Sequence, residues 1–397
     1  MSASMPLRLP ARRPARDAAL GCAVVLAVAL GVGRFAFTPL LPMMLASGAI
    51  DIRHGGWLAS CNYAGYFVGA LSCAAIPADH ARMVRFGLIA TVVLTFAMGV
   101  IDAFWLWAVV RFIAGAVSAW TFVFASQWGL RRLTELGASA WAGVIYTGPG
   151  VGIIVTGLIG AAAASLNANA VWIGFAALSA VACAFVWRIF RSDPRDAAPS
   201  ARPREPERAA VSTRRAEAAW LIVLYGLPGF GYIITATFLP VIARHALPGS
   251  AWPDLFWPVF GAALVVGALC ASRLPLHWDN RALLAGSYVL QAVGIALGIV
   301  FPTTAGFALG SVLIGLPFTA ITLFAMREAR RLRGERAAGL MGYATAAYGL
   351  GQIAGPLVAA PIAAHTGSFS IALWLAAGAL VVGSVGLLGV AARHRKP

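Results

Sequence analysis

The sequence predicts an all-α polytopic membrane protein with twelve transmembrane helices in two parallel six-helix repeats. The chain has 397 residues, of which 60% are hydrophobic and only 11% charged, whereas soluble globular proteins carry about 25% charged residues. Twelve apolar segments approach the length of roughly 20 residues that a membrane-spanning helix needs. Residues half a chain apart also match at a nearly constant spacing, which favours a duplicated six-helix unit.

The twelve apolar segments follow one another with short breaks. Asp102 separates the third from the fourth and Pro302 separates the ninth from the tenth, so these two hairpins are expected to be tight. The expected spans are 18–45, 56–76, 84–101, 103–130, 140–164, 169–190, 217–243, 254–274, 281–301, 303–327, 337–363 and 368–392.

A polar stretch divides the chain near its middle. Residues 191–216 hold four prolines and many charges, so they cannot bury a hydrophobic core and are expected to form a cytoplasmic linker. The expected domains are a cytoplasmic tail at 1–17, a six-helix bundle at 18–190, the linker at 191–216, a second six-helix bundle at 217–392 and a cytoplasmic tail at 393–397.

The basic residues predict how the chain is oriented in the membrane. The formal net charge is +16, from 30 lysines and arginines against 14 acids. If the N-terminus is placed inside, the outside loops hold only Arg53 and Arg244, and Arg34 and Arg111 lie within spans. This asymmetry predicts that both termini are cytoplasmic. Because the positive charge lies in loops, it indicates orientation rather than nucleic-acid binding.

No pattern typical of a metal, disulfide or enzyme site is present in the sequence. The five cysteines lie in apolar runs without a Cys-x-x-Cys pair, so they are interpreted as small apolar side chains. There is no His-Glu-x-x-His motif, and no histidine or acid lies mid-span to act as a base. We therefore expect no cofactor, no metal and no enzymatic activity, and we take a monomer as the default state.

The clearest internal match compares Gly31–Pro42 with Gly229–Pro240, at a shift of 198 positions (229 minus 31). Two glycines and the final Leu-Pro coincide, but Arg34 of the first segment meets Tyr232 of the second. Further matches at 198 or 199 positions occur in and after later spans. An even number of spans per copy makes the repeats parallel, an arrangement found in transporters whose halves rock against each other.

Arg34 is the charged side chain of the first apolar run. An arginine within the membrane carries a penalty of roughly 3 kcal/mol or more, so it needs a partner, a water-filled cavity or a ligand. Gly31 and Gly33 allow another backbone to come close. Pro39 and Pro42 interrupt the helical hydrogen bonds further along. The first span is therefore expected to line something other than lipid.

Three short patterns occur in the later spans. Arg111 in the fourth span is followed four residues later by Gly115, Gly148-Pro149 in the fifth span is followed by small residues, and a second Gly-Pro pair, Gly355-Pro356, occurs in the eleventh span. These patterns resemble the fourth-span and fifth-span motifs of the major facilitator superfamily.

The first span is similar to the signature of one branch of that superfamily, the YbfB/YjiJ branch, in the segment R-F-A-F-T-P-L-L-P at 34–42. The usual loop motif between the second and third spans is retained only at Asp79 and Arg85, with His80 where an arginine is usual. The resemblance implies a multi-pass transporter of the bacterial inner membrane. It implies that Asp79 caps a helix or pairs with a neighbouring arginine in a conformational latch.

The superfamily resemblance also implies that spans one, four, seven and ten line a central cavity. Arg34 lies ~24 Å from the inner start of span one, and Arg111 lies ~12 Å from the outer start of span four. Because these spans run in opposite directions, both arginines are expected at a similar level. One hypothesis is that they form an anion site, because guanidinium groups bind carboxylates and phosphates bidentately. The alternative is that Arg111 bonds the backbone of a neighbouring span, or that Arg34 bonds backbone freed by Pro39.

Polar and aromatic residues complete the set of candidates. The expected substrate-binding residues are Arg34, Arg111, Tyr232, Asn62, Tyr66, Tyr348 and Gln352. The expected conformational gating residues are Asp79, Arg85, Gly148, Pro149, Gly355 and Pro356.

These features predict a secondary active transporter that moves a small organic solute, anionic or amphipathic, by alternating access. Export is favoured, because proteins near this signature are often grouped with efflux proteins. The alternatives are an uptake permease or anion exchanger for a carboxylate, and a non-transporting receptor on the same fold. The expected partners are a small-molecule substrate, the lipid bilayer and a coupling proton. That proton would act through Asp51, Asp102 or the substrate itself, because no carboxylate lies deep in a span.

Overall fold

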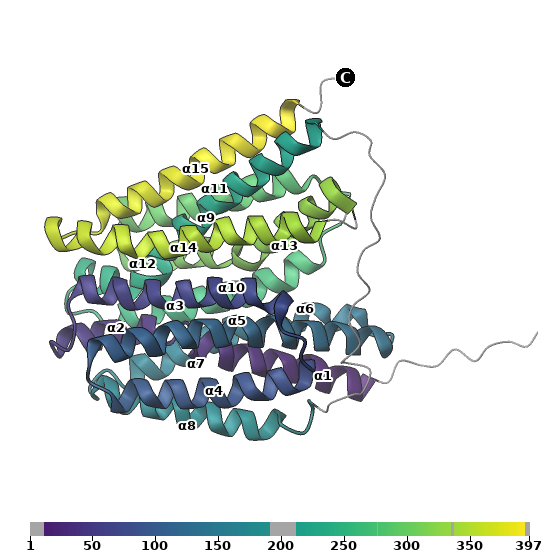
Figure 1. The fold of residues 1–397 in the computed structure, drawn as a ribbon. Helices are drawn as coiled ribbons and strands as arrows, with labels where there is room; N and C mark the ends of the chain where they lie inside the picture. Colours follow the sequence, from purple (N-terminus) through teal and green to yellow (C-terminus); the bar gives the residue numbers. More distant parts are fainter. Residues whose placement is uncertain (1–11, 191–211, 276, 335–336, 394–397) are drawn as a thin grey trace, which may run out of the picture.

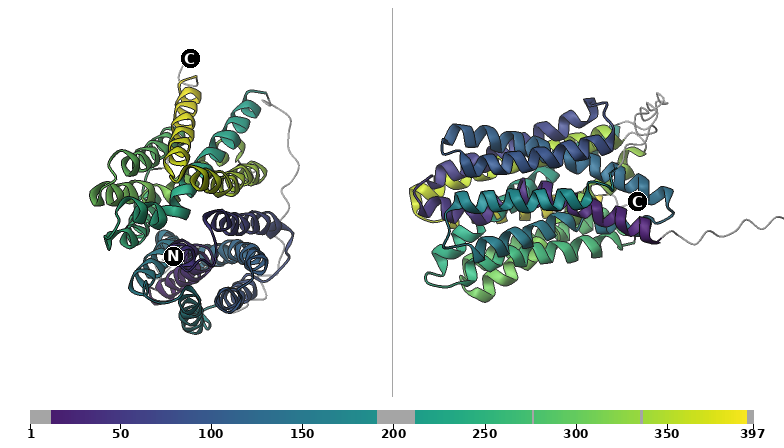
Figure 2. Two further views of the ribbon diagram at one scale, coloured as in Figure 1. Left: turned by 90° about the vertical axis from the view of Figure 1, so that its left-hand side faces the viewer. Right: turned by 90° about the horizontal axis from the view of Figure 1, so that it is seen from below.

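The computed structural model describes residues 12–190, 212–275, 277–334 and 337–393. The described part is a bundle of long helices that run side by side (Figure 1). Most of the expected linker, at 191–211, and most of the two expected tails, at 1–11 and 394–397, lie outside the described residues. Viewed along the helices, the first and second halves of the chain form two adjacent groups (Figure 2, left).

The first half of the chain forms helices α1 to α8. Their bounds are α1 Arg12–Leu26, α2 Phe37–Ala46, α3 Ile52–Ser72, α4 His80–Val100, α5 Phe104–Glu135, α6 Ala142–Ile145, α7 Gly148–Ala162 and α8 Ala168–Val186. A π-helical segment, Ala27–Val32, follows α1 and precedes α2. Short 3-10 turns occupy Cys73–Ala75 and Ser139–Trp141.

The second half forms helices α9 to α15. Their bounds are α9 Ser212–Ala246, α10 Phe256–Ser272, α11 Asn280–Val300, α12 Thr304–Gly315, α13 Phe318–Arg333, α14 Ala337–Thr366 and α15 Ser370–Arg393, with a 3-10 turn at Trp252–Leu255. In Figure 1, α1 begins and α15 ends at the same end of the bundle. We call this the linker end, because α8 ends and α9 begins there, and we call the other the opposite end.

Eleven candidate membrane spans are present in the described part of the chain. They correspond to the expected spans except the one near 56–76. That segment forms α3, a 21-residue helix that is not among the candidates by composition. It packs between α5 of its own half and α14 of the other half, so its polar side chains Asn62 and Tyr63 are buried in protein.

The first span is irregular in its middle. The chain is π-helical from 27 to 32 and makes turns from 33 to 36 before α2 begins. The sequence predicted that the helix is interrupted at Pro39 and Pro42, but both prolines lie inside α2. Pro39 is in the first turn of α2, where an N–H has no partner within the helix in any case. The break therefore precedes the prolines and includes Arg34.

Glycines let helices of the first half pack backbone to backbone. A Cβ at Gly65 of α3 would overlap the Phe112 carbonyl of α5, and a Cβ at Gly115 of α5 would overlap the Asn62 carbonyl of α3. These close approaches place α3 directly against the middle of α5. Small residues at such crossings are typical of helices packed in membranes.

The largest contacts between the two halves are those of α3 with α14, α7 with α10 and α2 with α9, and α6 also contacts α10. Among the described residues, three hydrogen bonds join the halves. Thr38 donates its hydroxyl to the Ala236 carbonyl at 2.9 Å, Tyr63 and Thr237 share a bond of 2.8 Å, and Ser60 donates to the Ile353 carbonyl at 2.9 Å. Thr38, Ser60 and Thr237 all lie on the stretches that lead from Arg34 toward the opposite end.

Candidate functional site

Arg111 of α5 binds the broken backbone of the first span. Pro39 has no N–H, and Thr38 donates its N–H to the Phe35 carbonyl at 3.2 Å rather than to the Arg34 carbonyl. The Arg34 carbonyl instead accepts from Arg111 Nη2 at 3.2 Å, and the Gly33 carbonyl accepts from Arg111 Nη1 at 3.4 Å. Arg111 thus supplies the hydrogen bonds that the irregular backbone lacks.

Asn62 of α3 binds the same backbone. Its Nδ2 donates to the Arg111 carbonyl at 2.9 Å and lies 3.5 Å from the Gly33 carbonyl. Gly65 and Gly115 bring the backbones of α3 and α5 close together, so the short Asn62 side chain can contact these carbonyl groups. Asn62 and Arg111 therefore hold three segments together: the broken first span, α3 and α5.

Arg34 lies at the same level as Arg111 but is bonded differently. Its side chain is 5% exposed, and its guanidinium carbon lies 4.3 Å from the ring centre of Tyr66, 4.9 Å from that of Tyr63 and 5.2 Å from that of Phe35. Its Nε and Nη2 have no hydrogen-bond partner among the described residues. No ion pair to Arg34 is found there either. The guanidinium group is therefore stabilised by cation–π contacts with three rings, and its Nε and Nη2 donors remain unbonded.

Nε and Nη2 form one edge of the guanidinium group, the edge that faces a carboxylate side-on. The chain itself shows this geometry elsewhere, because Arg244 uses Nε and Nη2 to bind both oxygens of Asp254, at 2.9 Å each. Such bidentate pairs combine charge with a defined planar geometry. The corresponding edge of Arg34 is free.

Tyr232 and Gln352 of the second half lie across the interface. Gln352 donates its Nε2 to the Tyr232 hydroxyl, and both side chains are buried. The ring of Tyr348 stacks on Tyr232 at 5.9 Å and on Tyr225 at 4.9 Å between centres. The ring of Tyr232 also contacts that of Phe318, and Phe318 contacts Phe35 next to Arg34. The aromatic side chains of the second half thus continue those around Arg34.

The expected gating residues occupy several places. Asp79 caps α4 by accepting the N–H of Arg82 at 2.8 Å. Arg85 of α4 donates to the Trp187 carbonyl, at the end of α8, at 3.2 Å and lies over the Trp187 ring. The conformational roles of these residues stay predictions.

The two Gly-Pro pairs lie at helix contacts. Gly148 and Pro149 begin α7, where a Cβ at Gly148 would overlap the Ala23 carbonyl. Gly355 of α14 packs on Ile233 of α9, and the Pro356 carbonyl oxygen would lie 2.9 Å from a Cβ at Gly56 of the other half. The second pair therefore touches both halves.

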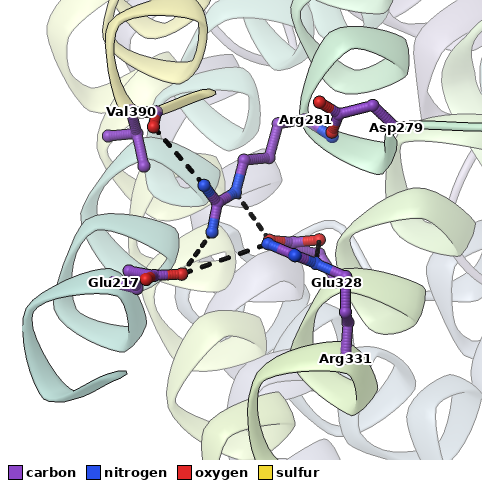
Figure 3. A network of polar contacts seen from close by, with 6 residues as sticks. All are labelled: Glu217, Asp279, Arg281, Glu328, Arg331 and Val390. Atoms are coloured by element: carbon purple, nitrogen blue, oxygen red, sulfur yellow. Dashed lines mark hydrogen bonds and ion pairs between the residues drawn. The ribbon is translucent and has the colours of Figure 1, made fainter. Parts of the chain in front are cut away.

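A buried charge cluster at the linker end was not anticipated as a unit. Arg281 of α11 binds Glu328 of α13 at 2.7 Å and also binds Glu217 of α9 (Figure 3). Arg281 further donates to the Val390 carbonyl of α15 at 3.4 Å, and Arg331 binds Glu328 at 2.8 Å. The cluster joins four helices of the second half. Only the i,i+3 spacing of Glu328 and Arg331 could have indicated a part of it from the sequence.

A cavity of about 370 Å³ lies at the opposite end, away from Arg34. It is lined mostly by apolar residues, with Leu45 and Ile52 from the first half and His245 and Phe369 among those from the second. No group of three or more metal-binding side chains occurs within the part of the chain that the structure describes.

Comparisons with known proteins agree with this architecture. A search of curated proteins returns no match. A crystal structure of a mutant of the nucleoside transporter NupG has the same fold, with a TM-score of 0.76 at 15% sequence identity, over 94% of this chain and 99% of that chain. The family model described as uncharacterised MFS-type transporter YbfB matches residues 26–388. The chain therefore belongs to this YbfB family of major facilitator superfamily transporters.

Proposed function

We propose that the chain is a secondary transporter for a small organic anion and that the anion binds to Arg34. The observation behind this proposal is the free Nε/Nη2 edge of Arg34, a residue that is only 5% exposed and has no carboxylate partner among the described residues. The corresponding edge of Arg244 binds a carboxylate in the same chain. A ligand carboxylate is the group that matches the free edge of Arg34.

Burial makes an anion at Arg34 favourable. A buried charge without a counter-ion carries a penalty of several kcal/mol, and the rings of Tyr63 and Tyr66 offset only about 2 kcal/mol of it. A bound anion would supply the missing charge and hydrogen bonds together. The free energy released on binding is then largest for ligands that place a negative charge at this guanidinium.

The other expected binding residues receive different roles in this proposal. Arg111 and Asn62 hold the backbone around Arg34 in place, because both Nη atoms of Arg111 and the Nδ2 of Asn62 donate to carbonyl groups. Tyr66 lies on the first half of the chain, and Tyr232, Tyr348 and Gln352 lie on the second. A ligand at Arg34 would therefore touch both halves, so its binding could alter how they fit together.

Alternating access is supported by the placement of contacts between the halves. Thr38 bonds Ala236, which lies 198 positions later, the shift seen in the sequence repeat. Gly31 meets Gly152 in the first half, and Gly229 meets Gly351 in the second. We therefore propose twelve spans in two parallel repeats that rock about the interface. In this proposal, the hydrogen bond between Tyr63 and Thr237 is one of the contacts that close the Arg34 site toward the opposite end and that break when the site opens there.

Orientation and direction of transport rest on the sequence. The distribution of basic residues favours cytoplasmic termini in the bacterial inner membrane. Export is the direction that we favour, on the resemblance to efflux proteins, and uptake or anion exchange is the alternative. We propose a monomer. A coupling proton would be carried by the substrate or by an acid near the opposite end.

The proposal is tested with purified protein in sealed liposomes. Wild type, Arg34→Gln and the exposed control Arg53→Gln are screened for thermal stabilisation by carboxylates, phosphates, sugars and aromatic cations, and anion flux is then measured. An anion that stabilises and is moved by wild type and Arg53→Gln, but not by folded Arg34→Gln, is the expected result. Normal anion transport by Arg34→Gln would overturn the proposal.

A further inference from the structure

We infer that the transported anion is an aromatic monocarboxylate, a flat ring that carries one carboxylate group. This inference rests on the proposed function and adds the substrate class to it. It follows from two features of the described structure: the number of free cationic donors at the interface between the halves, and the row of aromatic rings that begins beside Arg34.

The free donors match one carboxylate. Arg34 offers a single free edge with Nε and Nη2. Arg111 uses both of its Nη atoms on carbonyl groups of the first span, so only its single Nε is left without a partner among the described residues. Arg244 and Arg281 are bound to acids of their own half, Arg244 to Asp254 and Arg281 to Glu217 and Glu328. A second carboxylate on the ligand would be buried among rings without a second free guanidinium edge, which is strongly unfavourable.

A continuous row of rings leads from Arg34 into the second half. Phe35 contacts Phe318 at 6.2 Å, Phe318 contacts Tyr232 at 5.0 Å, and Tyr348 stacks between Tyr232 and Tyr225. The stacked pairs are nearly parallel, with angles of 21° and 23° between ring planes. This part of the interface is therefore built from ring-to-ring packing, which an aromatic ligand can extend where the rings keep accessible surface.

Three of these aromatic side chains retain accessible surface. Tyr66 of α3, Phe318 of α13 and Tyr348 of α14 are half-buried, whereas Tyr63 and Tyr232 are buried. Tyr66 also lies closest to the guanidinium group, at 4.3 Å. The accessible parts of these side chains therefore come from both halves, and Tyr66 adjoins the guanidinium group of Arg34. A ligand ring that packs against them would place its carboxylate at the free edge of Arg34.

The experiment compares four probes that share one size class. Benzoate has a ring and one charge, cyclohexanecarboxylate has the charge without aromaticity, terephthalate has a second carboxylate, and benzamide has the ring without charge. Binding to purified protein in lipid–detergent micelles is measured by calorimetry. Benzoate is expected to bind about 5- to 10-fold more tightly than cyclohexanecarboxylate, because aromatic pairs add to the effect of burial alone. It is also expected to bind at least tenfold more tightly than terephthalate or benzamide.

Variants then locate the selectivity. Tyr348→Leu is expected to bring the ratio of benzoate to cyclohexanecarboxylate affinity close to one. The control Tyr343→Leu changes the same residue type on the same helix, at a side chain that is 69% exposed, and is expected to keep the wild-type ratio. The comparison of probes on the wild type needs no variant, so the test holds even if Tyr348→Leu does not fold.

The outcomes separate the two proposals. If both monocarboxylates bind in an Arg34-dependent way but benzoate is not favoured, or if terephthalate binds as well as benzoate, the substrate class is wrong and the anion site stands. If benzamide equals benzoate, if Arg34→Gln keeps the affinity for the acids, or if no acid binds the wild type, the proposed function itself is overturned.

Discussion

Replacing each of the two buried arginines by glutamine should have opposite consequences for stability and binding. Arg111→Gln removes two hydrogen bonds from a charged donor, at 3.4 and 3.2 Å, to the Gly33 and Arg34 carbonyls. Bonds of this kind contribute about 1.5–3 kcal/mol each, and both are long, so the lower figure applies. We therefore expect Arg111→Gln to lower the free energy of unfolding by about 3 kcal/mol.

Arg34→Gln removes no hydrogen bond from its Nε/Nη2 edge. It loses contacts of the cation with the rings of Tyr63 and Tyr66, about 2 kcal/mol, and it relieves the burial of an unpaired charge, which is of similar or larger size. The net change in unfolding free energy should therefore stay within about 1 kcal/mol of the wild type, whereas the stabilisation by anions should disappear.

The assay is unfolding by SDS titration in lipid–detergent micelles, with and without a saturating anion. A ligand at a hundredfold excess over its dissociation constant adds about 2.7 kcal/mol, so the binding effect is as large as the structural one. Arg53→Gln, at an exposed position, is the control for removing one charge. Equal losses of stability in Arg34→Gln and Arg111→Gln would refute the division between a ligand-binding and a structural arginine.

Three further substitutions test other features of the structure. Glu328→Gln breaks the buried cluster of Figure 3 and should lower unfolding free energy by about 3 kcal/mol, while Glu135→Gln, in an exposed pair, should change it by less than about 1 kcal/mol; similar SDS-unfolding midpoints for the two would contradict this. Gly65→Ala, whose Cβ would overlap the backbone of α5, should fold poorly, whereas Gly174→Ala, which has open space, should express normally, as size-exclusion profiles would show. Asp51→Ala should lose a helix cap worth about 1 kcal/mol. The hydrogen bond from the backbone N–H of His54 lowers the pKa of Asp51. The stabilisation by the cap is therefore complete at neutral pH and is lost as the carboxylate is protonated below about pH 4. A wild-type advantage that does not shrink as the pH falls from about 5 to about 3 would contradict it.

Much of the fold followed from sequence patterns. The apolar segments predicted the spans that eleven described helices now occupy, because length and apolarity are the main requirements of a bilayer. The segment near 56–76 was harder, because α3 packs against α5 and α14 and can carry polar side chains such as Asn62 on its buried side. Its surroundings, and not its composition, make those residues tolerable.

The charge cluster shows a different limit. Glu217, Arg281 and Glu328 belong to three helices that are far apart in the chain. Each lies near the end of an expected span, where a charged residue usually reaches water. Their burial against one another depends on how α9, α11 and α13 converge at the linker end. Pairing across such distances leaves no local pattern in the sequence.

The sequence by itself determined that this is a polytopic membrane protein and that Arg34 and Arg111 both lie within apolar spans at a similar level. Composition, hydropathy and helical rise contain that information. Only the tertiary structure decided which arginine binds backbone carbonyl groups and which keeps a free edge. Pro39 and the bond from Thr38 to Phe35 leave the Arg34 carbonyl to Arg111, whereas the Arg34 side chain meets rings and keeps a free edge. The physical reason is that a hydrogen bond depends on where the partner atoms lie in space, and helices distant in sequence supply them.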